Sequence, residues 1–150
     1  MKRIIYTNQD LTTSIVVPTD DTVDFEALAN MVVPEGLSYE IVDITEIPSD
    51  RTYRNVWRHD TTPSLQKIGV VLADAQSISL EKVRAKRDTA LLEVDKQYII
   101  ASRTRESTVA LDAERLSLLA ATDPLKGLDV SSNKIIPVEE AAALIAPLEA

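Results

Sequence analysis

The chain has 150 residues, of which 45% are hydrophobic and 27% charged, the balance of a globular protein rather than a disordered one. Its 16 Lys and Arg against 24 Asp and Glu leave a formal net charge of −8, which opposes binding to nucleic-acid phosphates or to an anionic membrane surface. The absence of Cys excludes disulfides, thiolate metal sites and cysteine nucleophiles, and the three isolated glycines exclude a glycine-rich phosphate loop. No apolar run approaches the roughly 20 residues that a membrane span requires.

The first residues carry no pattern typical of a targeting signal. Lys2 and Arg3 are basic, but the apolar stretch that follows stops after Tyr6, whereas a secretory signal needs about 7–15 apolar residues. We therefore expect the protein to fold and act in a cytosol, or in a particle assembled there.

Residues 1–72 predict a small α/β head domain. Four short runs rich in β-branched residues are its expected strands: 3–7, 14–17, 38–44 and 68–72. The first two are separated by a polar turn cluster and predict a hairpin, and Pro18 ends the second because proline cannot donate to a strand ladder. The last run is either a strand or the lead-in to the helix that follows it.

One helix is expected between the second and third strands, so that this domain has the order β-β-α-β. We expect it to begin near Val23, with its N-cap among residues 19–22. Its apolar residues recur at helical spacing and form one stripe: Phe25, Leu28, Ala29 and Val32. Pro34 and Gly36 are expected to end this helix.

Residues 73–123 predict a long helical segment. Neither Gly nor Pro occurs between Gly69 and Pro124, and the interval is rich in good helix formers. The helix is expected to start between Asp74 and Ser79. Its apolar stripe, which Arg87 interrupts, consists of Leu80, Val83, Leu91, Val94, Tyr98 and Ala101.

Polar residues at 102–108 separate this stripe from a second apolar set in a different register: Val109, Leu111, Leu116, Leu118, Leu119 and Ala120. A helical hairpin that turns near residues 103–107 explains both facts. The competing interpretation is one uninterrupted rod of more than about forty residues, which would need a partner chain to cover its stripe. We favour the hairpin.

Residues 124–150 predict a loop and a short C-terminal helix. Pro124 is expected to end the second helix of the hairpin, because proline cannot continue the hydrogen-bond ladder. A loop over 126–133 follows, and Pro137 stands at a first-turn position of the last helix, which runs through about Ala146. The predicted fold class is therefore α+β: a small N-terminal β-β-α-β unit followed by a long helical hairpin and a short C-terminal helix.

His59 is the only imidazole in the chain. A general base held by Asp50 or Asp60 is conceivable, with Ser49 or Ser64 as nucleophile, but no nucleophile-elbow signature surrounds either serine. Metal binding through His59 and the two aspartates would lack a second imidazole or a thiolate. We expect His59 to be a surface residue, and we expect no catalytic residue, no metal site and no cofactor.

Residues 49–60 are the most distinctive stretch, because they hold the only Trp and three Arg within eight positions. In an extended conformation the side chains would alternate, with Tyr53, Asn55 and Trp57 on one face and Arg54, Val56 and Arg58 on the other.

Three interpretations of this stretch stay open. Its two aromatic residues could anchor the segment to the α/β core, with the arginine stems lying over aromatic surface. It could instead be a protein-interaction patch, since Trp, Tyr and Arg dominate interface hot spots. It could also bind single-stranded nucleic acid, which the net charge opposes. The candidate partner-binding residues are Arg51, Tyr53, Arg54, Trp57 and Arg58.

Seven segments spread over nearly the whole chain carry a family resemblance: KRIIY (2–6), VVP (16–18), YEIVD (39–43), IPSDRTYRNVW (47–57), VRAKRD (83–88), LLEVD (91–95) and ERLSLLAATDP (114–124). In these segments the chain resembles small tailed-bacteriophage proteins encoded beside tail-fibre and tail-tip genes. The helical half is similar to phage tail-fibre assembly chaperones. One departure is that residues 126–137 are longer than the short link expected after Asp-Pro.

The resemblance implies a non-enzymatic tail accessory protein that binds or braces a tail-fibre or baseplate component. It would act in the host cytoplasm during assembly, or remain in the virion tail. The alternatives are a minor structural virion protein, decorating head or tail, with no chaperone role, and a small hydrolase that uses His59. The expected partners are a phage tail-fibre or baseplate protein and another copy of the chain, with no nucleic acid and no membrane.

Overall fold

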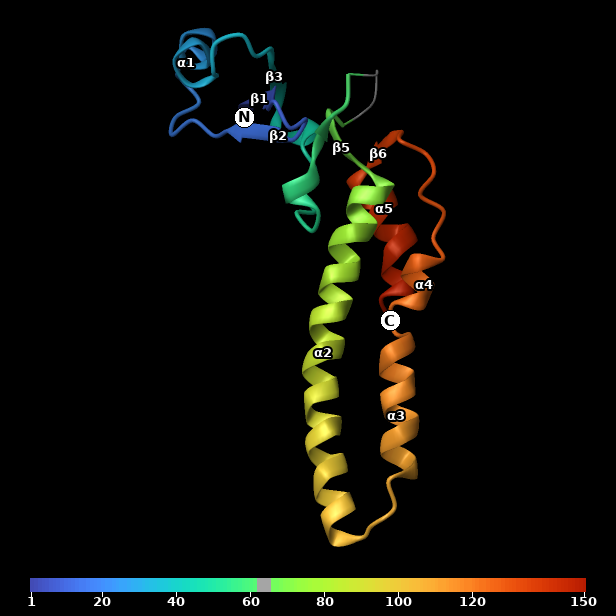
Figure 1. Cartoon of the computed structure of the whole chain (residues 1–150). Helices are drawn as coiled ribbons and strands as arrows, with labels where there is room; N and C mark the ends of the chain where they lie inside the picture. The colour runs from blue at the N-terminus through green and yellow to red at the C-terminus, as the bar shows by residue number, and fades with distance from the viewer. Residues whose placement is uncertain (62–65) are drawn as a thin grey trace. The chain divides into compact units, whose positions relative to one another are not determined.

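The computed structural model describes residues 1–61 and 66–150, and its fold class is α+β, as predicted (Figure 1). The chain divides into two compact units. The head unit comprises Met1–Ala75 and Ser131–Ala143, and the helical unit comprises Gln76–Val130 and Leu144–Ala150. Residues 131–143 therefore group with the head unit, whereas the sequence analysis set residues 124–150 apart from it.

The first sheet of the head unit has the order β2-β1-β3 and is antiparallel throughout. Its strands are β1 (Lys2–Thr7), β2 (Thr13–Val16) and β3 (Tyr39–Asp43). With α1 (Phe25–Val32) between β2 and β3, the predicted β-β-α-β order is confirmed. Ile4 and Ile5 point to opposite faces of the central strand and both are fully buried, so both faces of this sheet are covered.

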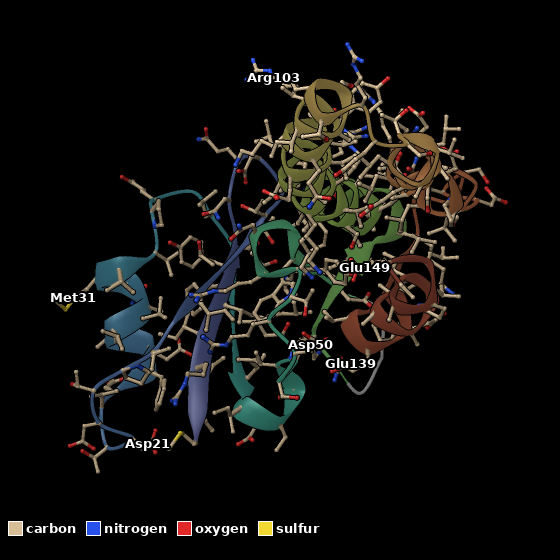
Figure 2. All side chains as sticks on the ribbon, turned by 90° about the horizontal axis from the view of Figure 1, so that it is seen from below. Asp21, Met31, Asp50, Arg103, Glu139 and Glu149 are labelled. Carbon is tan, nitrogen blue, oxygen red and sulfur yellow. The ribbon has the colours of Figure 1, made fainter. Side chains whose placement is uncertain are left out.

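The helix α1 begins two residues later than the sequence predicted. Its N-cap is Asp24, whose carboxylate accepts hydrogen bonds from the backbone amides of Glu26 and Ala27. Only Ala29 of the predicted stripe is fully buried, and Val32 is exposed. Figure 2 shows Met31 on the outer side of this helix, with its sulfur pointing away from the sheet.

A second antiparallel sheet has the order β4-β5-β6, from β4 (Arg58–His59), β5 (Ile68–Val71) and β6 (Ile135–Pro137). The sequence analysis missed β6, which returns from the C-terminal part of the chain to pair with β5. Gly69 permits this pairing, because a Cβ atom there would overlap the carbonyl oxygen of Ile136.

Two 3-10 helices lie between the sheets in the sequence, at Ile44–Glu46 and Arg54–Val56. The first has a capping box: the Asp43 carboxylate accepts from the Thr45 amide, and the Glu46 carboxylate accepts from the Asp43 amide. The second lies inside the Trp-containing stretch, so this part of the stretch does not take the extended conformation that was considered for it.

The long helix α2 covers Leu72–Thr104 and follows β5 without an intervening residue. It therefore starts earlier than the predicted interval, and Asp74 lies in its first turn instead of capping it. The predicted hairpin is confirmed: the chain turns at residues 105–108 and returns as α3 (Val109–Ala120), antiparallel to α2 (Figure 1).

The turn of the hairpin contains no glycine. Arg105 takes the left-handed conformation, with φ of 60°, and the Glu106 amide donates to the Ala101 carbonyl at 2.9 Å. These are features of a Schellman-type helix end, in which glycine is usual at the left-handed position. Of the apolar stripe predicted on α2, Val83, Val94 and Ala101 are buried, whereas Tyr98 is exposed.

Pro124 does not end the second helix of the hairpin. The helix α3 stops at Ala120, and Pro124 stands in the first turn of a further short helix, α4 (Asp123–Lys126). Proline suits this position because its missing amide has no helical acceptor there. Leu125 of α4 is fully buried, and its carbonyl accepts from Gln76 Nε2 at 2.6 Å.

The last helix, α5, covers Val138–Ile145 and is followed by a 3-10 turn at Ala146–Leu148. The sequence analysis placed Pro137 in the first turn of this helix, but Pro137 is the last residue of β6. Across residues 1–61 and 66–150, no helix combines the length and the apolar composition of a membrane span.

Candidate functional site

The two aromatic residues of the predicted interaction patch belong to the core of the head unit. Tyr53 is 2% exposed and Trp57 is 1% exposed. The chain forms a turn at Arg54–Val56, so the alternation of side chains that an extended conformation would give does not occur. The Trp57 carbonyl also accepts from the Thr13 amide at 2.9 Å, which fixes the segment to β2. Neither aromatic side chain can contact a partner in this conformation.

The three arginines of the patch differ in their surroundings. Arg51 and Arg54 are exposed and open to a partner. Arg58 is half-buried: its Nη2 donates to Asp74 Oδ2 at 2.8 Å and its Nη1 donates to the Asp10 carbonyl at 3.0 Å. Arg58 thus ties β4 to the first turn of α2 and to the β1–β2 turn.

His59 is held by a carboxylate that the sequence analysis did not name. Its Nε2 lies 2.9 Å from Glu40 Oε2, and Lys67 Nζ lies 3.0 Å from Glu40 Oε1. The hydrogen bond from Lys67, followed by that from His59, holds the pKa of Glu40 below its ordinary value of 4.5. The same carboxylate raises the pKa of Lys67 above its ordinary 10.5. Glu40 lies on β3, far from His59 in the sequence, and no local pattern signals this pairing.

A cavity of about 460 Å³ opens beside this cluster within the head unit. Nine residues from five separate segments line it: Thr7, Leu11, Arg58, His59, Val71, Ala73, Asp74, Asn133 and Ile135. Its size falls in the range of ligand pockets, and its lining combines apolar side chains with hydrogen-bonding ones. The carboxylate of the lining, that of Asp74, is already paired with Arg58.

Of the two serines considered as nucleophiles, the one that the structure describes, Ser49, is not among the residues that line the cavity. Ser49 is exposed, and Thr7 supplies a hydroxyl group to the lining. Ser64, the other serine that was considered, lies outside the described residues. Among residues 1–61 and 66–150, no three His, Asp or Glu side chains gather as metal ligands.

Leu11, at the β1–β2 turn, is the most unusual residue of the cavity. It has a φ of 68°, in the left-handed region, yet it is a leucine and its side chain is 64% exposed. The turn holds this conformation through backbone bonds from Leu11 to Asn8 at 3.0 Å and from Asn8 to Thr12 at 2.8 Å. A non-glycine residue in this region costs about 1–2 kcal/mol. Strain of this kind, with an exposed apolar side chain at a cavity, points to a functional contact.

Comparisons with protein-family models, curated proteins and solved structures give no match to this chain.

Proposed function

We propose that the protein is a non-enzymatic accessory protein of a bacteriophage tail, and that its head unit binds a tail-fibre or baseplate component at the cavity beside Arg58 and His59. The observation that carries the binding role is Leu11, a strained and exposed leucine on the cavity wall. The resemblance of the sequence to tail accessory proteins supports the choice of partner.

The cavity offers a partner both apolar contacts and hydrogen-bonding groups that would orient it. An apolar side chain of the partner would pack against Leu11, Val71 and Ile135, while Asn133 and Thr7 supply hydrogen-bonding groups. Covering an exposed leucine is worth roughly 1.5–3 kcal/mol, so Leu11 would be an anchor of the complex. The exposed Arg51 and Arg54 remain candidate contacts of smaller effect, because exposed charges contribute little to affinity.

Two variants test the role of Leu11. In Leu11→Gly, the left-handed backbone becomes unstrained, so we expect a melting temperature that is unchanged or higher. The affinity for the tail-fibre or baseplate protein should fall about tenfold or more, as measured by isothermal titration calorimetry. The matched control is Arg105→Gly, which relieves a left-handed non-glycine residue of the helical unit, at the hairpin turn. That variant should bind the partner normally.

Binding that survives Leu11→Gly unchanged would reject the cavity as the binding site. A wild-type chain that captures none of the tail components encoded beside it would reject the tail assignment. Mass spectrometry of purified particles separates the two forms of the proposal. A constant copy number in the virion supports a structural component of the tail, and absence from the particle supports a chaperone that acts in the host cytoplasm.

A further inference from the structure

The side of α2 that lies opposite its buried residues is exposed along most of the hairpin. The buried residues are Val83, Val94 and Ala101. Because successive residues of a helix turn by about 100°, seven residues between positions 81 and 103 lie within about 40° of a line that runs roughly 170° around α2 from the buried side. They are Glu81, Ala85, Asp88, Leu92, Lys96, Ile99 and Arg103. All seven are exposed, and we call this surface the outer face of α2.

The charges on the outer face are opposite in sign on the two sides of Leu92. Glu81 and Asp88 precede Leu92, and Lys96 and Arg103 follow it. Asp88 and Lys96 are each four residues from Leu92, and Glu81 and Arg103 are each eleven residues from it. Every carboxylate of the face therefore has a basic residue at the same distance on the other side of Leu92.

The apolar residues of the outer face are arranged in the same way by size. Ala85 and Ile99 lie seven residues before and seven residues after Leu92, so a small side chain corresponds to a large one. Leu92 and Ile99 are 64% and 53% exposed. When facing helices bring small residues against large ones, their side chains interdigitate without voids. In both charge and size, the face is thus complementary to a reversed copy of itself.

We propose that the outer face of α2 binds the same face of a second copy of the chain, with the two helices antiparallel and related by a two-fold axis at the level of Leu92. A two-fold interface must be complementary to itself. Residues equally far from Leu92 on opposite sides then meet across the axis. Each carboxylate of one copy faces a basic residue of the other, each Ala85 faces Ile99, and Leu92 faces its own copy. With a rise of about 1.5 Å per residue, the contact between residues 81 and 103 is about 33 Å long.

Charge complementarity selects the antiparallel arrangement. In a parallel pair each charged residue would meet its own copy, and like charges placed opposite each other destabilise a complex. Within the part of the chain that the structure describes, neither Glu81 nor Arg103 forms an ion pair. Figure 2 shows the Arg103 side chain pointing outward from the helical unit. The outermost charges of the face are therefore available to a second copy.

The inner charges of the face have partners in their own chain that do not compete strongly. Asp88 Oδ1 lies 2.7 Å from Arg87 Nη2, and Lys96 Nζ lies 3.7 Å from Glu93 Oε2. Exposed ion pairs of this kind contribute little free energy, so a second copy can add to them or replace them.

The rest of the hairpin does not oppose the contact. Asp95, which lies beside the outer face, is paired with Arg115 of α3 at 2.9 Å. Residues 76–121 carry eight Lys and Arg against seven Asp and Glu, whereas the rest of the chain carries eight against 17. Two hairpins can therefore approach without the long-range repulsion that opposes contacts through the acidic remainder. This inference goes beyond the function proposed for the head unit and does not depend on it.

Sedimentation velocity over a concentration series tests the proposal with charge-reversed variants of the full chain. The wild type should form a dimer that dissociates on dilution. Glu81→Arg and Arg103→Glu each set like charges opposite each other, so each should raise the dissociation constant of the dimer about tenfold or more. The variant that carries both changes has opposite charges again, with their places exchanged, and its dissociation constant should return to within about threefold of the wild type.

Three results would overturn the proposal. They are a wild type that is monomeric at every concentration, single variants that dimerise as the wild type does, and a double variant that does not recover although circular dichroism shows unchanged helix content. Added salt supplies a further check, because ions screen exposed charge pairs. It should weaken the wild-type dimer, and a dimer that salt leaves unchanged would contradict the assigned contacts.

Cysteine cross-linking gives a second readout, because the chain has no Cys of its own. Leu92→Cys puts a thiol at the two-fold axis, where it meets its own copy, and mild oxidation should convert most of the protein to a disulfide-linked dimer. The matched control is Leu116→Cys on α3, at a residue of similar exposure outside the outer face. It should react about tenfold more slowly or less under the same conditions. Equal rates for the two variants would contradict the assigned face.

Discussion

The Trp-containing segment of the head unit and the distal half of the hairpin contrast in what they expose. The segment holds the residue types that dominate protein interfaces, yet its Tyr53 and Trp57 are almost completely buried. The hairpin contains ordinary leucines, isoleucines and valines at helical spacing, and several of these are uncovered. Residue type alone is therefore a poor guide to which surface is available for binding.

Local conformation explains the burial in the Trp-containing segment, and the geometry of helix pairs explains the exposure in the hairpin. In the Trp-containing segment, Tyr53 and Trp57 flank a 3-10 turn at Arg54–Val56, and both aromatic side chains enter the core. Two antiparallel helices, in contrast, can cover only one stripe on each other. Any further apolar residues on those helices stay exposed unless another chain or segment packs on them.

The largest effect expected from this contrast is a loss of stability when the buried Trp57 is truncated. Trp57→Ala should destabilise the head unit by about 3–5 kcal/mol, because it removes a large buried side chain and leaves a cavity. Thermal unfolding followed by circular dichroism measures the loss. Trp57→Phe should cost much less, partly because the buried Trp57 Nε1 has no hydrogen-bond partner among the described residues.

The hairpin supplies the control for this measurement. Leu116→Ala removes an exposed side chain, so it should change the unfolding free energy of the monomer by less than about 0.5 kcal/mol. The contrast between the two regions would be wrong if Leu116→Ala were as damaging as Trp57→Ala at concentrations where the chain is monomeric.

A second test concerns the strand return that completes the head unit. Gly69→Ala places a methyl group against the Ile136 carbonyl, so β5 and β6 must separate, at a cost of about 1–3 kcal/mol. The matched control is Gly127→Ala in the helical unit, where the nearest atoms lie 3.5 and 3.6 Å from the added carbon. Chemical denaturation should show a lowered midpoint for the first variant and little change for the second. Equal midpoints would mean that the β5–β6 pairing contributes little to the stability of the head unit.

Features set by local sequence could be predicted. Runs of β-branched residues gave the first sheet, and the absence of Gly and Pro from residues 70–123 indicated long helix. The polar interval near residues 103–107 placed the turn of the hairpin correctly, because a helix whose apolar register changes cannot keep one face buried.

Features that depend on distant residues could not be predicted. The strand β6 is short, and only its pairing with β5 makes Ile135–Pro137 a strand. The contact between Glu40 and His59 joins two strands that the sequence does not relate. Leu11 lies in a turn without glycine, so nothing in its neighbours signals a left-handed backbone. The candidate site is built mostly from such contacts, which is why sequence reasoning chose Asp50 and Asp60 as partners of His59.

A third, smaller effect on stability is expected at the turn of the hairpin and not in the head unit. Arg105→Gly should stabilise the turn between α2 and α3 by about 0.5–1 kcal/mol, since glycine takes the left-handed conformation without strain. Amide hydrogen exchange should show slower exchange near residues 101–109 and no change in the strands of the head unit. Faster exchange at the turn would show that the Arg105 side chain contributes more than its backbone strain costs.

The smallest effect expected is that of the Glu40 cluster, which holds His59 and Lys67 in the head unit. Because the folded-state pKa of Glu40 lies below its ordinary 4.5, its stabilising contribution is complete above that pH and is lost as the pH falls through the lowered pKa. Glu40→Gln should therefore destabilise the protein near pH 7, and the difference from wild type should disappear in acid. Its size should be below about 1 kcal/mol, since the carboxylate is more than a third exposed and water screens the pair. Glu35→Gln, at an exposed carboxylate of the same unit, should show no such pH dependence in parallel urea titrations; a difference that persists in acid would mean that Glu40 acts through packing and not through its charge.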